Sequence, residues 1–500
     1  MEPGADWVSC DQLQLASWAM EPAAPGFPVE FVSTEMFGIC HQTSTPSSTQ
    51  LVKYEAATHC DPIEKEAQAF EIDSDNMEVI IHNPIHVFEE AAQEVEINAD
   101  LMRMKIHKYP ASMRDLDKRY REPNIVAIGP HHHGKDHLMH AEKMKHAAAY
   151  HCITESGHSV QEIYDDVVSV ADYARALYDT DVVAGIGDND FLPMMFYDAC
   201  FLVQYMLYVA CFYQQDYSEM DSSLVSYFDS NDDAIYHDIM LLDNQLPWLV
   251  VEAVMRFRPV NMKHFIACLR DCLQEVSVKD DEFELDANFQ PPHLLGLLRF
   301  YIVGRSKNKL EKDPSLYLTV SPSELAEVGI SLKANEKIDL TDMCIKKRGP
   351  FFADLCMPPL QLDARPSWLI NMAALEICMS SDFLEEEDEY SAVCSYLNLL
   401  TMLVHREADV YDLRKKGLLQ GGGGFTDQEA LAFFSSLRSL RHGSSYIRTI
   451  VDIQDYMRKR PTRTKVHAFI YRNIKIITTF FSALVALIGI LGTLKSLKVP

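Results

Sequence analysis

The hydrophobic pattern of the chain is strongest near its C-terminal end. Between Lys475 and Lys495 no residue is charged, and the run 476–494 (IITTFFSALVALIGILGTL) is mostly apolar. Folded as an α-helix, this run spans roughly 28 Å, which is close to the hydrocarbon thickness of a bilayer. The pattern predicts a transmembrane helix over residues 476–494. The alternative is a buried core helix, which the hydroxyl residues within the run favour.

Two further apolar runs predict helices of the folded interior. The run 191–213 is almost wholly apolar, but Asp198 and Gln204 interrupt it, so we expect a buried core helix rather than a second membrane span. The run 235–257 has apolar residues at spacings of three and four, and Pro247 lies near its middle. Because proline removes a backbone donor, we expect a kinked helix there, or two helices that meet.

Shorter signals predict the remaining elements. Ser323 resembles the N-cap of a short helix that ends at Gly329. Rough alternation of apolar and polar residues predicts short strands around 331–340 and 359–362. The acidic run 385–389 is typical of a solvated loop. The predicted fold is therefore mainly α: a large helical globular domain with a few short strands, plus one C-terminal transmembrane helix.

Charge is distributed very unevenly along the chain. The formal net charge is -28, and residues 1–100 contain 19 acidic residues against Lys53 and Lys65 alone. Because 22–50 is also rich in Pro, Ser and Thr, we expect 1–100 to be an acidic, partly disordered extension, followed by the helical domain over 101–457. A basic juxtamembrane segment, 458–475, precedes the apolar run and contains Arg458, Lys459, Arg460, Arg463, Lys465, Arg472 and Lys475.

These charges limit the classes of partner. A nucleic-acid surface needs a face of Lys and Arg, and the sequence has none outside the C-terminal tail, so we expect no nucleic acid. Basic residues beside an apolar helix instead favour a lipid bilayer. The N-terminal residues lack a secretory signal pattern, and the 12 cysteines form no CxxC pair, which is typical of reduced core residues. We therefore expect a single-pass membrane protein, at the plasma membrane, with most of the chain in the cytosol.

The densest polar cluster is a histidine-rich run at 131–140. On a helix that began near Gly134, His133, His137 and His140 would lie on one face, where imidazoles and a carboxylate can hold zinc. A metal-assisted hydrolase at this site is the alternative function. The other interpretation is a turn whose histidines bond the neighbouring backbone. The sequence contains no HExxH motif, phosphate-binding glycine loop or GxSxG elbow, so we predict no catalytic residue, no metal and no cofactor.

A polar triplet interrupts the second apolar run. Asp243, Asn244 and Gln245 stand beside Pro247 among apolar residues. A buried polar group without a hydrogen bond costs about 1 to 3 kcal/mol, so these side chains need partners. We expect them to satisfy backbone groups freed where the proline interrupts the helix. A ligand-binding polar pocket is the alternative.

Both polar runs resemble signatures of a known family. The stretch EPNIVAIGPHHHG at 122–134 resembles the pattern P..VSIGPYHHG, and LLDNQLPW at 241–248 resembles LLENQIPFF, of the plant family called domain of unknown function 247. Similar stretches occur in the same order at 198–202, 293–295, 323–329 and 369–376, and the C-terminal apolar run completes the set. The resemblance covers about residues 101–500. His131 replaces a family Tyr and Asp243 a family Glu, so the third histidine is no family hallmark, which weakens the zinc interpretation.

The resemblance implies a helical, membrane-associated plant protein without established catalysis. Some members are linked to grass self-incompatibility loci as recognition determinants. We therefore expect a membrane-anchored interaction or signalling protein with unknown protein partners, and a recognition determinant of the self-incompatibility type is one such role. The motif residues are expected to be structural: Gly129, Pro130, His132, His133 and Gly134 in a turn, and Asp243, Asn244, Gln245 and Pro247 in a kinked core helix. One face of the anchor carries small residues through which two copies would pair as a homo-oligomer: Ser482, Ala486, Gly489 and Thr493.

Overall fold

The computed structural model describes the helical domain and the C-terminal helix. The described residues are 101–113, 116–212, 217–218, 220–274, 284–308, 320–336, 339–349, 352–362, 366–421, 425–459 and 469–496. The chain divides into two compact units, residues 1–80 and 81–500, and every described residue belongs to the second. The predicted acidic extension, 1–100, lies outside the described residues, as does part of the predicted basic segment, 458–475.

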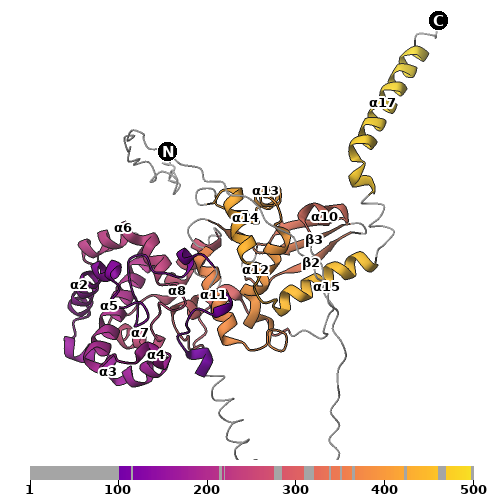
Figure 1. Cartoon of the computed structure of the whole chain (residues 1–500). Helices are drawn as coiled ribbons and strands as arrows, with labels where there is room; N and C mark the ends of the chain where they lie inside the picture. Colours follow the sequence, from indigo (N-terminus) through magenta and orange to yellow (C-terminus); the bar gives the residue numbers. More distant parts are fainter. Residues whose placement is uncertain are drawn as a thin grey trace, which may run out of the picture. The chain divides into compact units, whose positions relative to one another are not determined.

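The first group of helices surrounds one long apolar helix, α5 (Figure 1). These helices are α2 (Met139–Ser156), α3 (Val160–Ala176), α4 (Thr180–Val183), α5 (Asp188–Phe212), α6 (Ser222–Asp238), α7 (Trp248–Met255) and α8 (Met262–Gln274). Helices α2, α3, α7 and α8 pack against α5, and the apolar window of α5 is 83% buried. The predicted core helix over 191–213 is therefore confirmed.

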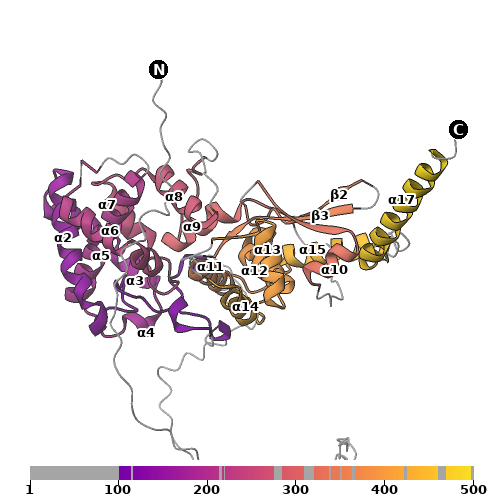
Figure 2. The same cartoon turned by 90° about the horizontal axis from the view of Figure 1, so that it is seen from above.

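The second group of helices packs around α12, every residue of which is buried (Figure 2). Its members are α9 (Leu294–Val303), α10 (Pro322–Glu327), α11 (Pro366–Met379), α12 (Ala392–Leu403), α13 (Glu407–Lys415), α14 (Asp427–Ser436) and α15 (Ser444–Lys459). Helix α12 contacts α11, α14 and α15. Short 3-10 helices lie at Ala111–Met113, Lys118–Tyr120, Asp136–Leu138 and Asp388–Ser391, and α17 (Ile474–Ser496) follows near the C-terminal end.

Two small sheets complete the domain. Strands β1 (Ile330–Ala334), β2 (Cys344–Arg348) and β3 (Phe352–Met357) form a sheet in the order β1-β3-β2, with β1 parallel and β2 antiparallel to β3. Strands β4 (Leu360–Gln361) and β5 (Leu419–Gln420) pair in parallel. One contiguous core of buried apolar residues joins the sheets and both helix groups. The predicted mainly α fold with a few short strands is confirmed.

Of the two expectations for 235–257, a kinked helix or two helices that meet, the structure shows two helices, which a loop separates. Helix α6 ends at Asp238, residues 239–247 form a loop, and α7 begins at Trp248. The side-chain amide of Asn244 donates to the Asp238 carbonyl at 2.9 Å, and that of Gln245 donates to the carbonyls of Ile239 at 2.6 Å and Leu241 at 2.8 Å. These carbonyls would accept backbone N–H groups in a continuing helix, so the polar side chains end α6 before the proline is reached.

Three smaller predictions also need correction. The helix expected near Gly134 begins later, with the 3-10 turn Asp136–Leu138 and then α2. Helix α10 is capped by Ser321, whose hydroxyl accepts the Glu324 N–H in a capping box, and not by Ser323. Within the acidic run 385–389, Asp388 is buried rather than solvated, because Ser444 and Arg448 bond its carboxylate.

Candidate functional site

The two motif segments, far apart in the sequence, meet in the core. Ile128 donates its N–H to the side-chain oxygen of Asn244 at 2.7 Å, and the Asn244 amide donates to the Val126 carbonyl at 3.1 Å. Beside this contact, His132 Nε2 lies 2.9 Å from a carboxylate oxygen of Asp243. Asn244 is fully buried and His132 nearly so. The side chain of Asn244 thus joins the first motif segment to the α6–α7 loop.

Gln245 ties the same loop to a third segment. Its side-chain oxygen accepts the Leu295 N–H of α9 at 3.1 Å, while its amide donates to the two carbonyls that follow α6. Pro247 then precedes α7, whose first N–H, from Trp248, donates to the Pro292 carbonyl at 2.8 Å. These contacts fix the relative positions of α6, α7 and α9. Gln245 is buried, and its side-chain amide and oxygen are both engaged by groups of the fold.

Asp238, which the sequence did not single out, holds the first motif segment. Its carboxylate accepts the backbone N–H groups of Asn124 at 2.7 Å, Ile125 at 2.7 Å and Val126 at 2.8 Å. Burial raises the pKa of Asp238, and the three N–H groups oppose that rise because they stabilise the ionised form. The segment therefore has its backbone donors satisfied by a side chain instead of by a neighbouring strand.

A cluster of buried charged side chains contacts the same motif segment at Gly129. The ammonium of Lys145 in α2, which is fully buried, lies 2.6 Å from Asp198 in α5 and 2.6 Å from Glu142. The other oxygen of Asp198 accepts the Gly129 N–H at 2.8 Å. Burial alone would lower the pKa of Lys145, but the two carboxylates outweigh it and raise that pKa, so the lysine stays charged. The lone carboxylate in an apolar run was the sequence signal for Asp198, whereas Lys145 resembles a solvated lysine.

The histidine-rich turn is not built as a metal site. His133 lies in a turn ahead of the helix, and His133, His137 and His140 are all exposed. His137 Nε2 lies 3.3 Å from the Pro123 carbonyl. Among the described residues, no group of three or more His, Cys, Asp or Glu side chains is placed to hold a metal ion. The three histidines do not share one helical face, because the helix begins after His133, and the interpretation as a turn describes His133.

Position 129 requires a glycine, both because its backbone φ is positive and because neighbouring atoms leave no room for a Cβ. Its φ is +73°, and an added Cβ would lie 2.7 Å from the Gln245 carbonyl oxygen and 2.9 Å from the Tyr178 hydroxyl. Gly134 shares the positive φ, +77°, but has open space around it. We expect Gly134→Ala to cost about 1 to 2 kcal/mol for the backbone conformation alone, and Gly129→Ala about 1 to 3 kcal/mol more for overpacking. Urea unfolding followed by circular dichroism tests this, and equal shifts for the two variants would contradict it.

Because His293, at the start of α9, is buried, we expect the stability of the folded protein to depend on pH. The side chain is fully buried, and its Nδ1 accepts the Gly296 N–H at 3.3 Å as the N-cap of the helix. Burial lowers the pKa of His293 to about 3, so the unfolded chain takes up a proton below about pH 6.5 that the folded chain does not. Stability is therefore lost as the pH falls, by about 2 kcal/mol between about pH 7 and about pH 5.

His293→Asn isolates this contribution, since asparagine keeps an N-cap acceptor but does not titrate. The variant should lose less stability than the parent protein between the same two pH values. Unfolding midpoints measured at both values give the comparison. If the two proteins lose stability in parallel, the effect comes from other groups.

The C-terminal helix differs from every buried helix described above. Both α5 and α17 are long and apolar enough to cross a membrane. The window Ile474–Leu491 of α17 has a mean hydropathy of 2.3 and none of it is buried, whereas the window of α5 is 83% buried. The predicted span, 476–494, lies within α17. Helix α17 is therefore a candidate membrane span, and α5 is a core helix.

Together these features define a mainly α protein with a candidate C-terminal span and a polar junction in its core. This junction, where the motif segments 122–134 and 241–248 meet, is called the motif junction below. The chain belongs to a family described as plant protein of unknown function, whose family model matches residues 106–488, so the resemblance noted in the sequence is confirmed. It is also similar to UPF0481 protein At3g47200 of Arabidopsis thaliana, with 22% identity over 367 residues, 66% of this chain and 72% of that protein. No solved structure matches the chain.

Proposed function

We propose that the protein is a single-pass membrane protein whose helical domain acts by binding other proteins and not by catalysis. The observation that carries the proposal is the contrast between the two apolar helices, α5 within the core and α17 with its apolar window wholly unburied. Ile476, Phe480 and Val485 are each more than half exposed. A surface of this kind is unfavourable in water and favourable in a lipid bilayer.

Three hydroxyl residues of α17 are compatible with lipid. Each of the three donates to a carbonyl one turn earlier at 2.8 Å: Thr478 to Ile474, Thr479 to Lys475, and Ser482 to Thr478. A polar group that is satisfied within its own helix does not need water or a protein partner. These residues, which favoured a buried core helix at the level of sequence, therefore fit a transmembrane helix equally well.

The finer parts of the proposal concern place and partners. We infer a plasma-membrane protein with its helical domain in the cytosol, anchored beside anionic lipid headgroups by the basic segment 458–475. Recognition of the self-incompatibility type is the role that the family resemblance suggests. Pairing of two anchors through Ser482, Ala486, Gly489 and Thr493 belongs to the same proposal. Proximity labelling from the N-terminus in native cells tests place and partners together: plasma-membrane and cytosolic neighbours are expected, and luminal neighbours would overturn the orientation.

Alkaline extraction of membranes that contain the full chain tests the anchor itself. A spanning helix stays in the lipid pellet at high pH, whereas a protein held only by surface charge is released. We expect the full chain to remain in the pellet together with a known single-pass protein. Its release into the supernatant with peripheral proteins would overturn the proposal.

A further inference from the structure

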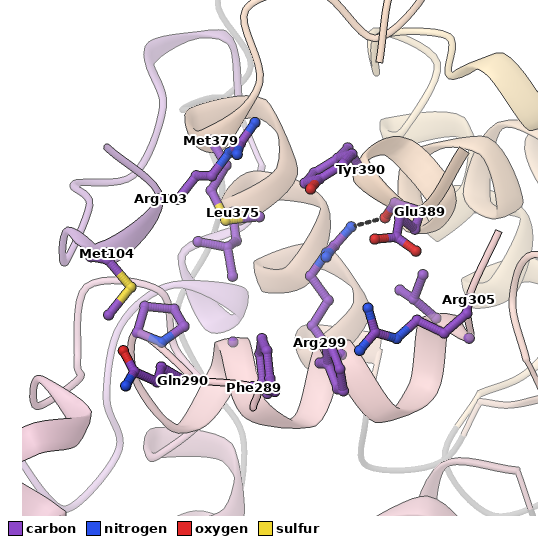
Figure 3. Close-up of a pocket in the computed structure, with 15 residues that line it drawn as sticks. Arg103, Met104, Phe289, Gln290, Arg299, Arg305, Leu375, Met379, Glu389 and Tyr390 are labelled. Atoms are coloured by element: carbon purple, nitrogen blue, oxygen red, sulfur yellow. Dashed lines mark hydrogen bonds between the residues drawn. The ribbon is translucent and has the colours of Figure 1, made fainter. Parts of the chain in front are cut away.

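A cavity of about 380 Å³ lies between α9 and α11. Figure 3 shows its walls: Phe289 and Arg299 from the α9 side, Leu375 and Met379 from α11, and Tyr390 from the 3-10 helix Asp388–Ser391. Its volume falls within the range of small-molecule sites, roughly 300 to 1,000 Å³.

One wall is fixed by a buried ion pair. The guanidinium of Arg299 donates to a single carboxylate oxygen of Glu376 through Nε at 3.1 Å and Nη2 at 2.6 Å, and also bonds the backbone carbonyl of Glu389. Glu376 is fully buried and also accepts the N–H groups of Val393 at 2.9 Å and Cys394 at 2.8 Å. These contacts hold Arg299 in place as part of the cavity wall.

The base of the cavity is aromatic. The rings of Phe289 and Phe300 stack with centroids 3.5 Å apart and an angle of 11° between their planes. The guanidinium of Arg305 lies 4.1 Å from the centroid of Phe300, and its Nη2 lies 2.6 Å from a carboxylate oxygen of Asp286. Both members of that ion pair are substantially exposed, so the pair contributes little and leaves the arginine able to meet an anion.

Most of the charged groups of the cavity gather at one end, which we call the polar end. In Figure 3, Arg299, Arg305, Glu389 and Tyr390 lie at that end, whereas Met104, Phe289 and Gln290 lie towards the other and Arg103 lies beside Met379. The charged side chains of the lining are those of Arg103, Arg299, Arg305 and Glu389. Since Glu376 neutralises Arg299, the cation offered to an anion at this end is Arg305, whose own pair with Asp286 is exposed and weak.

We propose that this cavity binds a small organic anion with an apolar body. The anionic group, a carboxylate or a phosphate, lies at the polar end within reach of Arg305. The apolar body, an aromatic ring system or a short hydrocarbon chain, lies between Phe289 and Leu375. A dissolved organic acid and the headgroup of an anionic lipid share this chemistry.

Calorimetric titration of the full chain in lipid nanodiscs tests the proposal. The probes are benzoate, naphthalene-2-carboxylate and decanoate, each compared with its neutral amide, and empty nanodiscs provide the blank. We expect at least one carboxylate to bind about tenfold more tightly than its amide, as a single charge-assisted contact implies. Nanodiscs with and without phosphatidic acid separate the sources: unchanged binding identifies a dissolved ligand, and competition by the lipid identifies a headgroup.

Arg305→Gln is the informative variant, and Arg119→Gln is its matched control. Arg119 also lies over a ring, that of Tyr120 at 4.9 Å, and also pairs with an aspartate, Asp117 at 3.1 Å, but it does not line the cavity. We expect Arg305→Gln to remove most of the preference for the carboxylate over the amide, and Arg119→Gln to leave it intact.

A second variant tests the site of the apolar body. Met379 is only half-buried, so Met379→Trp fills the cavity without removing a core side chain, and circular dichroism checks that it folds. It should weaken the carboxylate and the amide together. No carboxylate that binds better than its amide, equal effects of the two arginine variants, or a folded Met379→Trp protein with unchanged binding would each overturn the proposal.

Discussion

Lys145→Met is expected to lower the free energy of unfolding by about 3 to 5 kcal/mol. Methionine fits the space of the lysine stem, so the loss is mainly electrostatic. The substitution leaves Asp198 fully buried without its cation while that carboxylate still holds the Gly129 N–H. Urea unfolding of the full chain, followed by circular dichroism, measures the change.

The control is Lys118→Met, because Lys118 pairs with Glu122 at 3.6 Å on the surface. An exposed pair of this kind contributes at most about 1 kcal/mol. Adding Asp198→Asn to Lys145→Met should recover part of the loss, since asparagine keeps an acceptor for Gly129 without a buried charge. If Lys145→Met and Lys118→Met destabilise equally, the buried ion cluster does not support the motif junction.

Aspartates placed in the middle of α17 are expected to remove the protein from membranes. The variant carries Val485→Asp and Ile488→Asp, at positions that are 67% and 61% exposed. Each charge near the centre of a span opposes insertion by about 2.5 to 3.5 kcal/mol, so the pair offsets most of the gain from the apolar residues. The helical domain should keep its unfolding midpoint, because this part of α17 contributes nothing to the buried core.

Val203→Asp in α5 should unfold the helical domain, unlike the aspartates in α17, if α5 is the core helix and α17 the membrane span. Val203 is fully buried in the core, so the charge should prevent stable folding of the helical domain. Membrane fractionation and circular dichroism, applied to both variants, separate the two effects. A double aspartate variant that unfolds the domain would show that α17 is part of the core, and a folded one that stays in the membrane would show that attachment does not depend on the apolar middle of α17.

The sequence was most informative where structure depends on local pattern. The long apolar runs predicted α5 and α17, and the single carboxylate Asp198 distinguished the core helix from the candidate span. The polar triplet at 243–245 was correctly placed beside a helix interruption. The amides of Asn244 and Gln245 bond backbone carbonyls freed at the interruption, as expected, but sequence spacing does not show which carbonyl each donor meets.

Residues whose roles depend on distant partners could not be predicted. Lys145 lies in a polar stretch, and only the packing of α2 on α5 brings it to Asp198. Asp388 lies in an acidic run, and Arg448 from a later helix buries it. Strand β2 (CIKKR) has no buried residue and lacks clear alternation, and it is defined by its antiparallel pairing with β3. In each case the determining contact is long-range.

The central claim is that α17 resides in lipid and holds the helical domain at a membrane. The most direct measurement is membrane fractionation of native cells that contain either the full chain or a version that ends after Arg472. The membranes are washed in about 1 M salt. At this concentration the Debye length is about 3 Å, so the basic segment no longer binds headgroups. We expect the full chain in the washed pellet and the shortened chain, still folded, in the supernatant. Equal distribution of the two chains between pellet and supernatant would contradict the account.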